Sequence, residues 1–85
     1  FFKSDNKYTR VATGEHDVLI RKTIRELAEA LDPDVFWQIH RSAIVNVNQV
    51  ASVGHAPNGG LVLRLKDRRE ILPVSPRYAH RFHRM

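Results

Sequence analysis

Cysteine is absent from this sequence of 85 residues. A chain without thiols forms no disulfide framework, and it offers no thiolate nucleophile and no cysteine-ligated zinc site. The absence fits a reducing compartment, and we expect a cytoplasmic protein. Long apolar runs are absent as well, so we expect neither a membrane-spanning segment nor a signal peptide.

The chain is short, and it begins with Phe1 rather than Met. We therefore expect one domain over residues 1–85, trimmed at its N-terminus from a longer protein. A domain of this size buries only about 60–65% of its unfolded surface, so we expect no large active-site cavity. The apolar share of 42% and the charged share of 27% are typical of a globular fold and exclude a disordered chain.

Positive charge is concentrated near the C-terminus. Residues 1–63 contain seven basic and seven acidic side chains, whereas residues 64–85 contain seven basic and two acidic ones. Ten of the fourteen basic residues are arginine, which can form two parallel hydrogen bonds to a phosphate or a guanine edge. The pattern indicates a polyanionic partner.

Alternating and apolar runs predict five to seven short strands separated by polar turns. The asparagine and the glycines of residues 57–60 predict a tight hairpin, and Pro73 indicates an edge position or a bulge. Residues 1–2 are read as the end of an earlier strand, and residues 4–6 as a turn. The predicted strands cover residues 7–13, 18–20, 36–39, 43–45, 49–53, 61–65 and 70–74.

Two short helices are predicted between and after these strands. Thr23 and Glu26 have the spacing of a capping box, and apolar residues follow at helical intervals until Pro33. Ser75-Pro76 predicts the start of a second helix, which we expect to run through Met85. The fold is therefore mostly β, and we expect a sandwich or a stack of small sheets.

The triplet His40-Arg41-Ser42 interrupts two apolar runs, Phe36–Ile39 and Ala43–Val45. Arg41 must face solvent or a ligand, because burial of an unpaired guanidinium is very costly. His40 is either an internal histidine with satisfied hydrogen bonds or part of a site. Ser42 is either a cap for the following turn or part of the same site.

The segment FWQIHRSAIVN, residues 36–46, resembles the signature of LytTR domains, the DNA-binding output domains of many bacterial response regulators. The segments KYTR (7–10), TIREL (23–27) and VSPRY (74–78) resemble further family motifs in the expected order. The resemblance covers nearly the whole chain. Pro76 departs from it, since it moves Arg77 one position further along than in many members.

The resemblance implies an elongated stack of small antiparallel sheets, three in number, with one short helix between strands and one at the C-terminus. It also implies sequence-specific binding of double-stranded DNA in transcription regulation. Loops would enter two successive major grooves and the minor groove between them, and two protomers would bind direct repeats. An upstream domain, expected to be a receiver of a two-component system, would lie outside this chain.

Base contacts carried over from the family fall on Arg77, Arg41 and Thr9. Arg77 would bind guanine with both of its terminal nitrogens, and Arg41 would approach the minor groove, where negative potential is concentrated. Phosphate contacts are expected from the same loops, from the first helix and from other basic positions. These are Lys7, Arg10, Ser42, Ser75, Thr23, Arg25, Arg68, Arg69 and Arg81.

Other functions have weaker support in the sequence. His80 and His83 have a spacing found in zinc sites, but no third ligand is indicated, so we expect no metal. No catalytic constellation or cofactor motif stands out, and we expect no enzyme. The alternatives are an RNA-binding or single-strand-binding β domain, with Tyr8 and Trp37 as stacking residues, and a basic protein-interaction module. A core position is favoured for Trp37.

Overall fold

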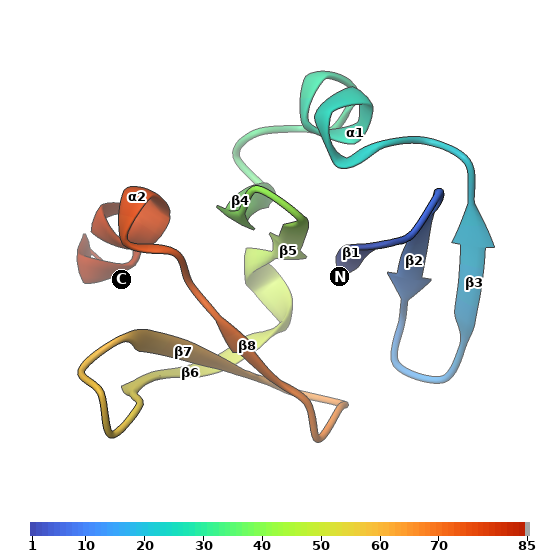
Figure 1. Cartoon of the computed structure of the whole chain (residues 1–85). Coiled ribbons are helices and arrows are strands. Elements are labelled where there is room, and N and C mark those ends of the chain that lie inside the picture. The colour runs from blue at the N-terminus through green and yellow to red at the C-terminus, as the bar shows by residue number, and fades with distance from the viewer. Residues whose placement is uncertain (85) are drawn as a thin grey trace.

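The computed structural model describes residues 1–84, with side chains as far as Phe82. Eight strands lie within these residues (Figure 1), which exceeds the predicted five to seven. They are β1 (Phe2–Asp5), β2 (Tyr8–Ala12), β3 (Asp17–Ile20), β4 (Phe36–His40), β5 (Ala43–Asn46), β6 (Val50–His55), β7 (Leu61–Leu65) and β8 (Ile71–Pro73).

Two α-helices, α1 (Ile24–Ala30) and α2 (Pro76–Ala79), accompany the strands. Short 3-10 helices cover Val47–Gln49 and His80–Arg84. The predicted second helix is thus an α-helix as far as Ala79 and a 3-10 helix from His80 to Arg84, and Met85 lies outside the described residues. None of the described helices has the length and apolar character needed to cross a membrane.

The strands form two antiparallel sheets rather than three. One sheet has the strand order β3-β2-β1-β5-β4, and the other has the order β6-β7-β8. A single larger sheet arises because β1 pairs on both sides: Phe2 lies opposite Val11 of β2 and opposite Ile44 of β5. The predicted mostly-β stack of small antiparallel sheets with two short helices is otherwise confirmed.

The first strand is longer than the sequence indicated. Ser4 and Asp5 belong to β1, where they pair with Thr9 and Tyr8. The turn is therefore confined to the next two residues, and Asn6 has a φ of 55°. Asparagine tolerates this left-handed conformation better than most residues do, which explains how such a tight turn forms here.

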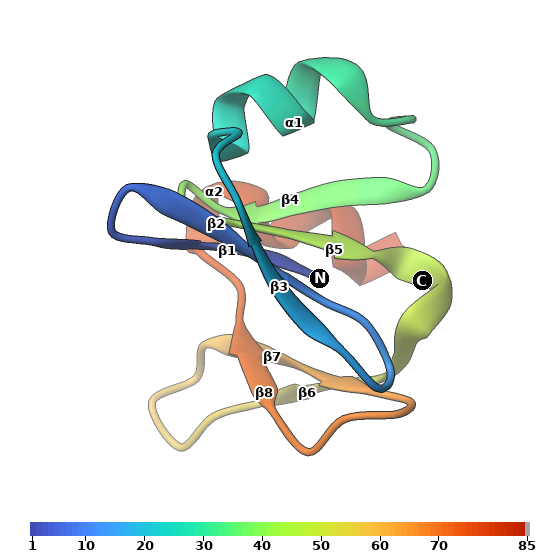
Figure 2. The same cartoon turned by 90° about the vertical axis from the view of Figure 1, so that its right-hand side faces the viewer.

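The larger sheet is the middle layer of the molecule (Figures 1 and 2). Strand β5 shows why, because side chains alternate between the two faces of a strand. Ile44 packs with Ile24 and Leu27 of α1 on one face. Val45 packs on the other face in the larger cluster, which includes Leu63 of the smaller sheet. Helix α1 and the smaller sheet thus cover opposite faces of the middle layer.

Several local predictions are confirmed. The side chain of Thr23 accepts the backbone N–H of Glu26, and the Glu26 carboxylate accepts that of Thr23, which completes the capping box. Gly59 has a φ of 88° in the predicted hairpin turn, and Pro73 lies in the edge strand β8. Trp37 packs against the main core, with its ring centroid 5.1 Å from that of Phe82.

Candidate nucleic-acid interface

Three connections of the larger sheet meet around one surface groove of about 280 Å³. They are the β1–β2 turn, the link from β3 to α1 and the β4–β5 turn. The groove is lined by the basic side chains Lys7, Lys22, Arg25 and Arg41, and by no aspartate or glutamate. We call this the cationic groove. Because its charges are of one sign, it attracts an anion.

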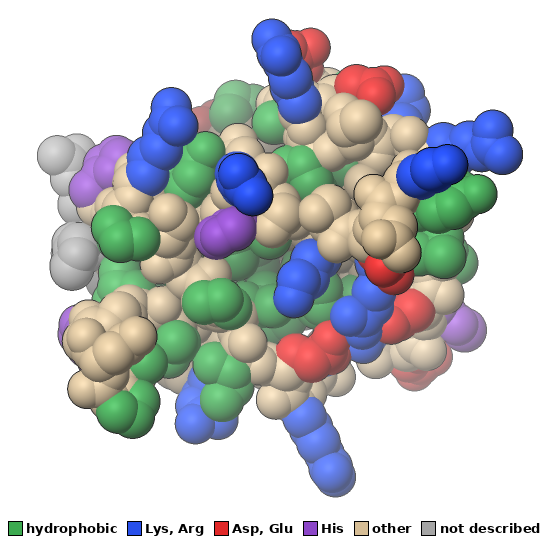
Figure 3. Space-filling view, in the orientation of Figure 1, with side chains coloured by type: hydrophobic (Ala, Val, Ile, Leu, Met, Phe, Trp, Pro, Cys, Tyr) green, Lys and Arg blue, Asp and Glu red, His purple; other side chains and the backbone are tan. Residues whose placement is uncertain are grey.

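The β4–β5 turn and the start of α2 lie on the same side of the molecule as the β1–β2 turn, at the left edge of Figure 2. Figure 3 looks directly onto this side. Lys and Arg side chains are spread across it, and acidic side chains lie mainly at its top and lower right. The loops that were predicted to enter DNA therefore share one face.

Arg41 projects from a two-residue turn. Strand β4 ends at His40 and β5 begins at Ala43, and the backbone N–H of Ser4 donates to the carbonyl of Ser42 at 2.9 Å. Arg41 is exposed, and its guanidinium has no hydrogen bond or ion pair with the residues that the structure describes. The turn therefore holds an uncommitted cation at the rim of the cationic groove.

The start of α2 lies next to this turn. The backbone N–H of Ser75 donates to the carbonyl of Ile39 at 2.8 Å. Within the described part of the chain, the Ser75 hydroxyl makes no capping bond to the helix. Arg77 is exposed, and its guanidinium carbon lies 5.8 Å from the centre of the Tyr78 ring.

Two predicted contacts conflict with the structure. The side chain of Thr9 is only 1% exposed, and its hydroxyl donates to the carbonyl of Lys22, so it cannot reach a base. The hydroxyl of Ser42 lies 2.8 Å from Nδ1 of His40. It is engaged within the turn, and we do not retain it as a phosphate donor.

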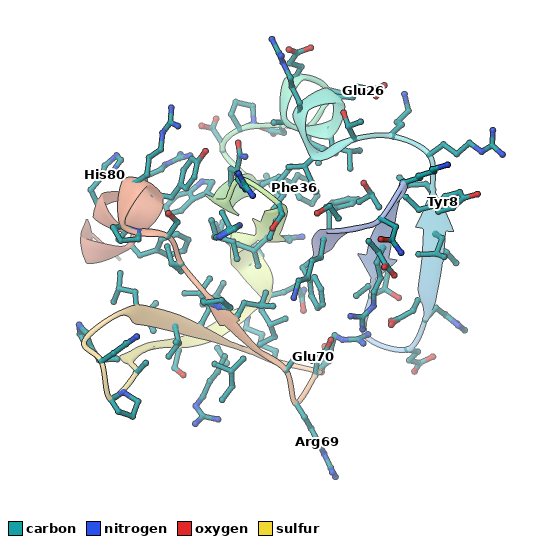
Figure 4. The ribbon with its side chains drawn as sticks, viewed as in Figure 1. Tyr8, Glu26, Phe36, Arg69, Glu70 and His80 are labelled. Carbon is teal, nitrogen blue, oxygen red and sulfur yellow. The ribbon has the colours of Figure 1, made fainter. Side chains whose placement is uncertain are left out.

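The N-terminus of α1 is also a poor phosphate site. Both the hydroxyl and the N–H of Thr23 are engaged by Glu26, and the negative charge of that carboxylate repels a phosphate. Figure 4 shows Glu26 at the outer side of the helix. Arg25 remains a candidate, because its only ion pair with a described residue is an exposed one of 3.8 Å to Glu29, and such pairs are weak.

Arg10 and Arg68 lie in an ion-pair cluster away from the cationic groove. Nη2 of Arg10 lies 2.6 Å from Asp17 and 2.9 Å from Glu70. Arg68 binds the same two carboxylates at 2.9 and 2.6 Å, and it also donates to the carbonyl of Thr13. Each guanidinium is already paired with two carboxylates, and neither lines the cationic groove. The structure therefore does not bring Arg10 and Arg68 to the candidate interface.

The cluster changes the acidity of its carboxyl groups. Hydrogen bonds from Arg10 and then Arg68 hold the pKa of Asp17 below its usual value. The pKa of Glu70 is lowered as well, mainly by the hydrogen bond from Arg68 and next by that from Arg10. Both groups therefore stay ionised to lower pH than in an unfolded chain.

Arg69 and Arg81 also lie apart from the groove. Arg69 points outward from the turn between β7 and β8 (Figure 4). The surface there also carries the carboxylates of Glu15, Asp17, Asp67 and Glu70, which repel a phosphate. The guanidinium carbon of Arg81 lies 4.2 Å from the centre of the Trp37 ring, a stacking contact that occupies one of its faces.

Lys22 was not among the sequence-predicted contacts. It lies between β3 and the capping residue Thr23, and its side chain lines the cationic groove. Its position beside two predicted contacts, Thr23 and Arg25, was a signal that the sequence offered.

Among the described residues there is no cluster of three histidine or acidic side chains arranged to hold a metal ion.

Comparison with known proteins also indicates a nucleic-acid-binding domain. A family profile of the LytTr DNA-binding domain matches residues 1–85. An uncharacterised response regulatory protein of Vibrio cholerae is 36% identical over 86 residues, which cover 96% of this chain and 32% of that protein. The transcriptional regulatory protein YpdB of Escherichia coli is 32% identical over 75 residues, covering 88% and 31%. The chain thus spans about a third of the length of these relatives.

A solved structure of a LytTr DNA-binding domain, from a response regulator of Bacillus cereus, has the same fold. It superposes with a TM-score of 0.85 at 29% identity, and the match covers 98% of this chain and 75% of the other. The profile spans the loops that carry the uncommitted cations as well as the strands that support them. The chain belongs to the LytTr DNA-binding domain family, and it is a DNA-binding domain of transcription regulation.

Proposed function

We propose that this domain recognises double-stranded DNA with the cationic groove, the β4–β5 turn and the start of α2. The single observation that carries the proposal is the separation of charges. Lys7, Lys22, Arg25 and Arg41 share a groove without a carboxylate, whereas Arg10 and Arg68 are each bound to two carboxylates. Only the first group is available to phosphates.

Within this face we assign different tasks to different side chains. Lys7, Lys22 and Arg25 neutralise phosphates, and the Ser75 hydroxyl donates to one. Arg41 enters the minor groove, since a guanidinium on a narrow turn suits its negative potential. Arg77 recognises a guanine in the major groove through a bidentate contact. Phosphate contacts would then set orientation, and the two arginines would supply sequence preference.

The wider arrangement is part of the same proposal. The domain would be the output part of a two-component response regulator, with a receiver domain upstream and two copies bound to direct repeats. The names of the similar proteins, a response regulatory protein and a transcriptional regulatory protein, support this context. Such a regulator would act in the cytoplasm.

Selection of duplexes from a random library, followed by fluorescence anisotropy, tests the function. We expect enrichment of two short half-sites in the same orientation, and binding that weakens steeply with added salt. A single strand of the selected sequence should compete poorly. Equal competition by single strands, or no enrichment at all, would overturn the proposal.

A further inference from the structure

We propose that His40 is a positioning residue for Arg41: its imidazole fixes the turn from which Arg41 reaches DNA. This inference rests on the proposed interface and adds a residue to it. The ring is half-buried at the end of β4. It lines the groove that also contains Asn58, Ser75 and Pro76, so it lies between the turn and the start of α2.

The hydrogen bonds of the ring define its proton state. The backbone N–H of Ser42 donates to Nδ1 of His40 at 3.2 Å, and the Ser42 hydroxyl lies 2.8 Å from the same nitrogen. An amide N–H can only donate, so Nδ1 must present its lone pair. This geometry fits the tautomer with its proton on Nε2, in which Nδ1 accepts from both groups of Ser42.

Hydrogen bonds fix the backbone on both sides of Arg41, at His40 and at Ser42. The β4–β5 pairing is irregular between Gln38 and His40, and the amide of Gln38 donates to the carbonyl of His40 at 3.1 Å. The imidazole then closes the turn across Arg41 by holding Ser42. A fixed backbone lowers the conformational entropy that the exposed arginine must lose when it binds. His40 would thus act through Arg41, not by touching DNA itself.

Two substitutions of His40 distinguish the role of Nδ1 from that of Nε2. Asparagine places an oxygen acceptor close to the position of Nδ1 but has nothing at Nε2, whereas glutamine reaches the position of Nε2 and loses the acceptor for Ser42. We expect His40→Gln and His40→Ala to weaken binding of the selected duplex by about three- to tenfold, the effect of one or two hydrogen bonds. His40→Asn should retain affinity within about twofold. The reverse order would overturn the inference.

A double-mutant cycle with Arg41→Ala tests whether His40 acts through Arg41. We expect His40→Ala to cause no further loss of affinity once Arg41 has been removed. An equal loss in both backgrounds would overturn the positioning role. If Arg41→Ala alone leaves affinity unchanged, the proposed interface itself is wrong, which distinguishes the two failures.

The proton position can be measured without DNA. Long-range ¹H–¹⁵N correlation spectra of the free domain distinguish the two neutral tautomers of a histidine ring. We expect the ring of His40 to be protonated at Nε2 in the wild-type domain. In Ser42→Pro, which lacks the backbone donor, we expect Nδ1 of His40 to lose its hydrogen bonds. A ring protonated mainly at Nδ1 in the wild-type domain would contradict the geometry on which the inference depends.

Discussion

Arg41 and Arg10 carry the same guanidinium, but their surroundings give them opposite roles. Arg41 is exposed on a turn and lines a groove without carboxylates. Arg10 lies within 3 Å of two carboxylates, those of Asp17 and Glu70. A phosphate gains a free cation at Arg41, whereas at Arg10 it must displace existing partners. In the proposed interface, the availability of each arginine, more than the total charge of the domain, would therefore decide which one contacts DNA.

Arg77 carries our prediction for sequence readout. Arg77→Ala should cost about 1–3 kcal/mol of binding free energy and relax the preference at one base pair. Arg77→Lys keeps the charge but cannot form the two-pronged contact, so it should lose the preference while retaining more of the affinity. Competition with duplexes that carry single base-pair changes measures both quantities. An unchanged preference in both variants would exclude this role.

Thr9 illustrates the opposite case, a residue that the family resemblance associates with bases and that the structure buries. Thr9→Val keeps the shape of the side chain but removes its hydrogen bond to the carbonyl of Lys22. We expect a loss of about 1 kcal/mol in the free energy of unfolding, with unchanged base preference. Chemical denaturation and the same competition assay check the two parts. A shift in base preference would restore Thr9 to the interface.

At the scale of elements, helix α1 begins where its sequence indicates. Thr23→Ala should destabilise the fold by about 1 kcal/mol because it removes the N-cap. Thr23→Ser, which retains the hydroxyl, serves as the control. Affinity for DNA should hardly change in either variant, since the Thr23 hydroxyl and N–H are engaged by Glu26. A tenfold loss of affinity with Thr23→Ala alone would show that Thr23 contacts a phosphate after all.

The start of α1 and the turn between β1 and β2 differ in how well the sequence predicts them. Thr23 and Glu26 are three residues apart, so their capping box could be recognised directly. Asn6 could not be recognised as the sole sharp corner between β1 and β2, because Ser4 and Asp5 are also typical turn residues. Their place in a strand depends on pairing with Thr9 and Tyr8 and, through Phe2, with the distant strand β5.

The candidate site was predictable to a similar extent. The triplet around Arg41 and the segment around Arg77 have local signatures, and both lie on the side of the molecule that carries the cationic groove (Figure 2). The fate of Arg10 depends on Glu70, which is 60 residues away. No local pattern reveals such a partner, so the sequence could not separate a structural arginine from one that is free to bind.

At the scale of the whole molecule, the ion-pair cluster links the two sheets. Arg10 and Asp17 belong to β2 and β3 of the larger sheet, and Arg68 and Glu70 belong to the turn before β8 of the smaller one. The Arg68 guanidinium also lies 5.6 Å from the centre of the Phe1 ring. The cluster therefore opposes separation of the sheets at the end where their turns meet.

This arrangement predicts a loss of stability in acid. The pKa values of Asp17 and Glu70 are lowered in the folded protein, so the unfolded chain binds more protons as the pH falls. Their contribution is present above the unfolded values of about 4 and is lost as the pH falls through the folded ones. Thermal melting from pH 7 to pH 2 should show this decline. Asp17→Asn and Glu70→Gln should weaken the dependence.

The matched control for this experiment is Glu29→Gln, which removes a carboxylate whose exposed ion pair is long, at 3.8 Å. We expect its melting profile to follow that of the wild-type domain, because such pairs contribute little. If all three variants changed the acid decline equally, the decline would reflect total charge and not the cluster.

The salt dependence of duplex binding tests the central claim most directly, that the cationic groove and not the net charge of the domain binds DNA. Lys7→Ala and Lys22→Ala should each reduce the slope of log affinity against log salt by about 0.9, the effect of one lost phosphate contact. Arg69→Ala removes the same charge from the turn before β8 and should leave the slope unchanged. Equal reductions in all three variants would contradict the account.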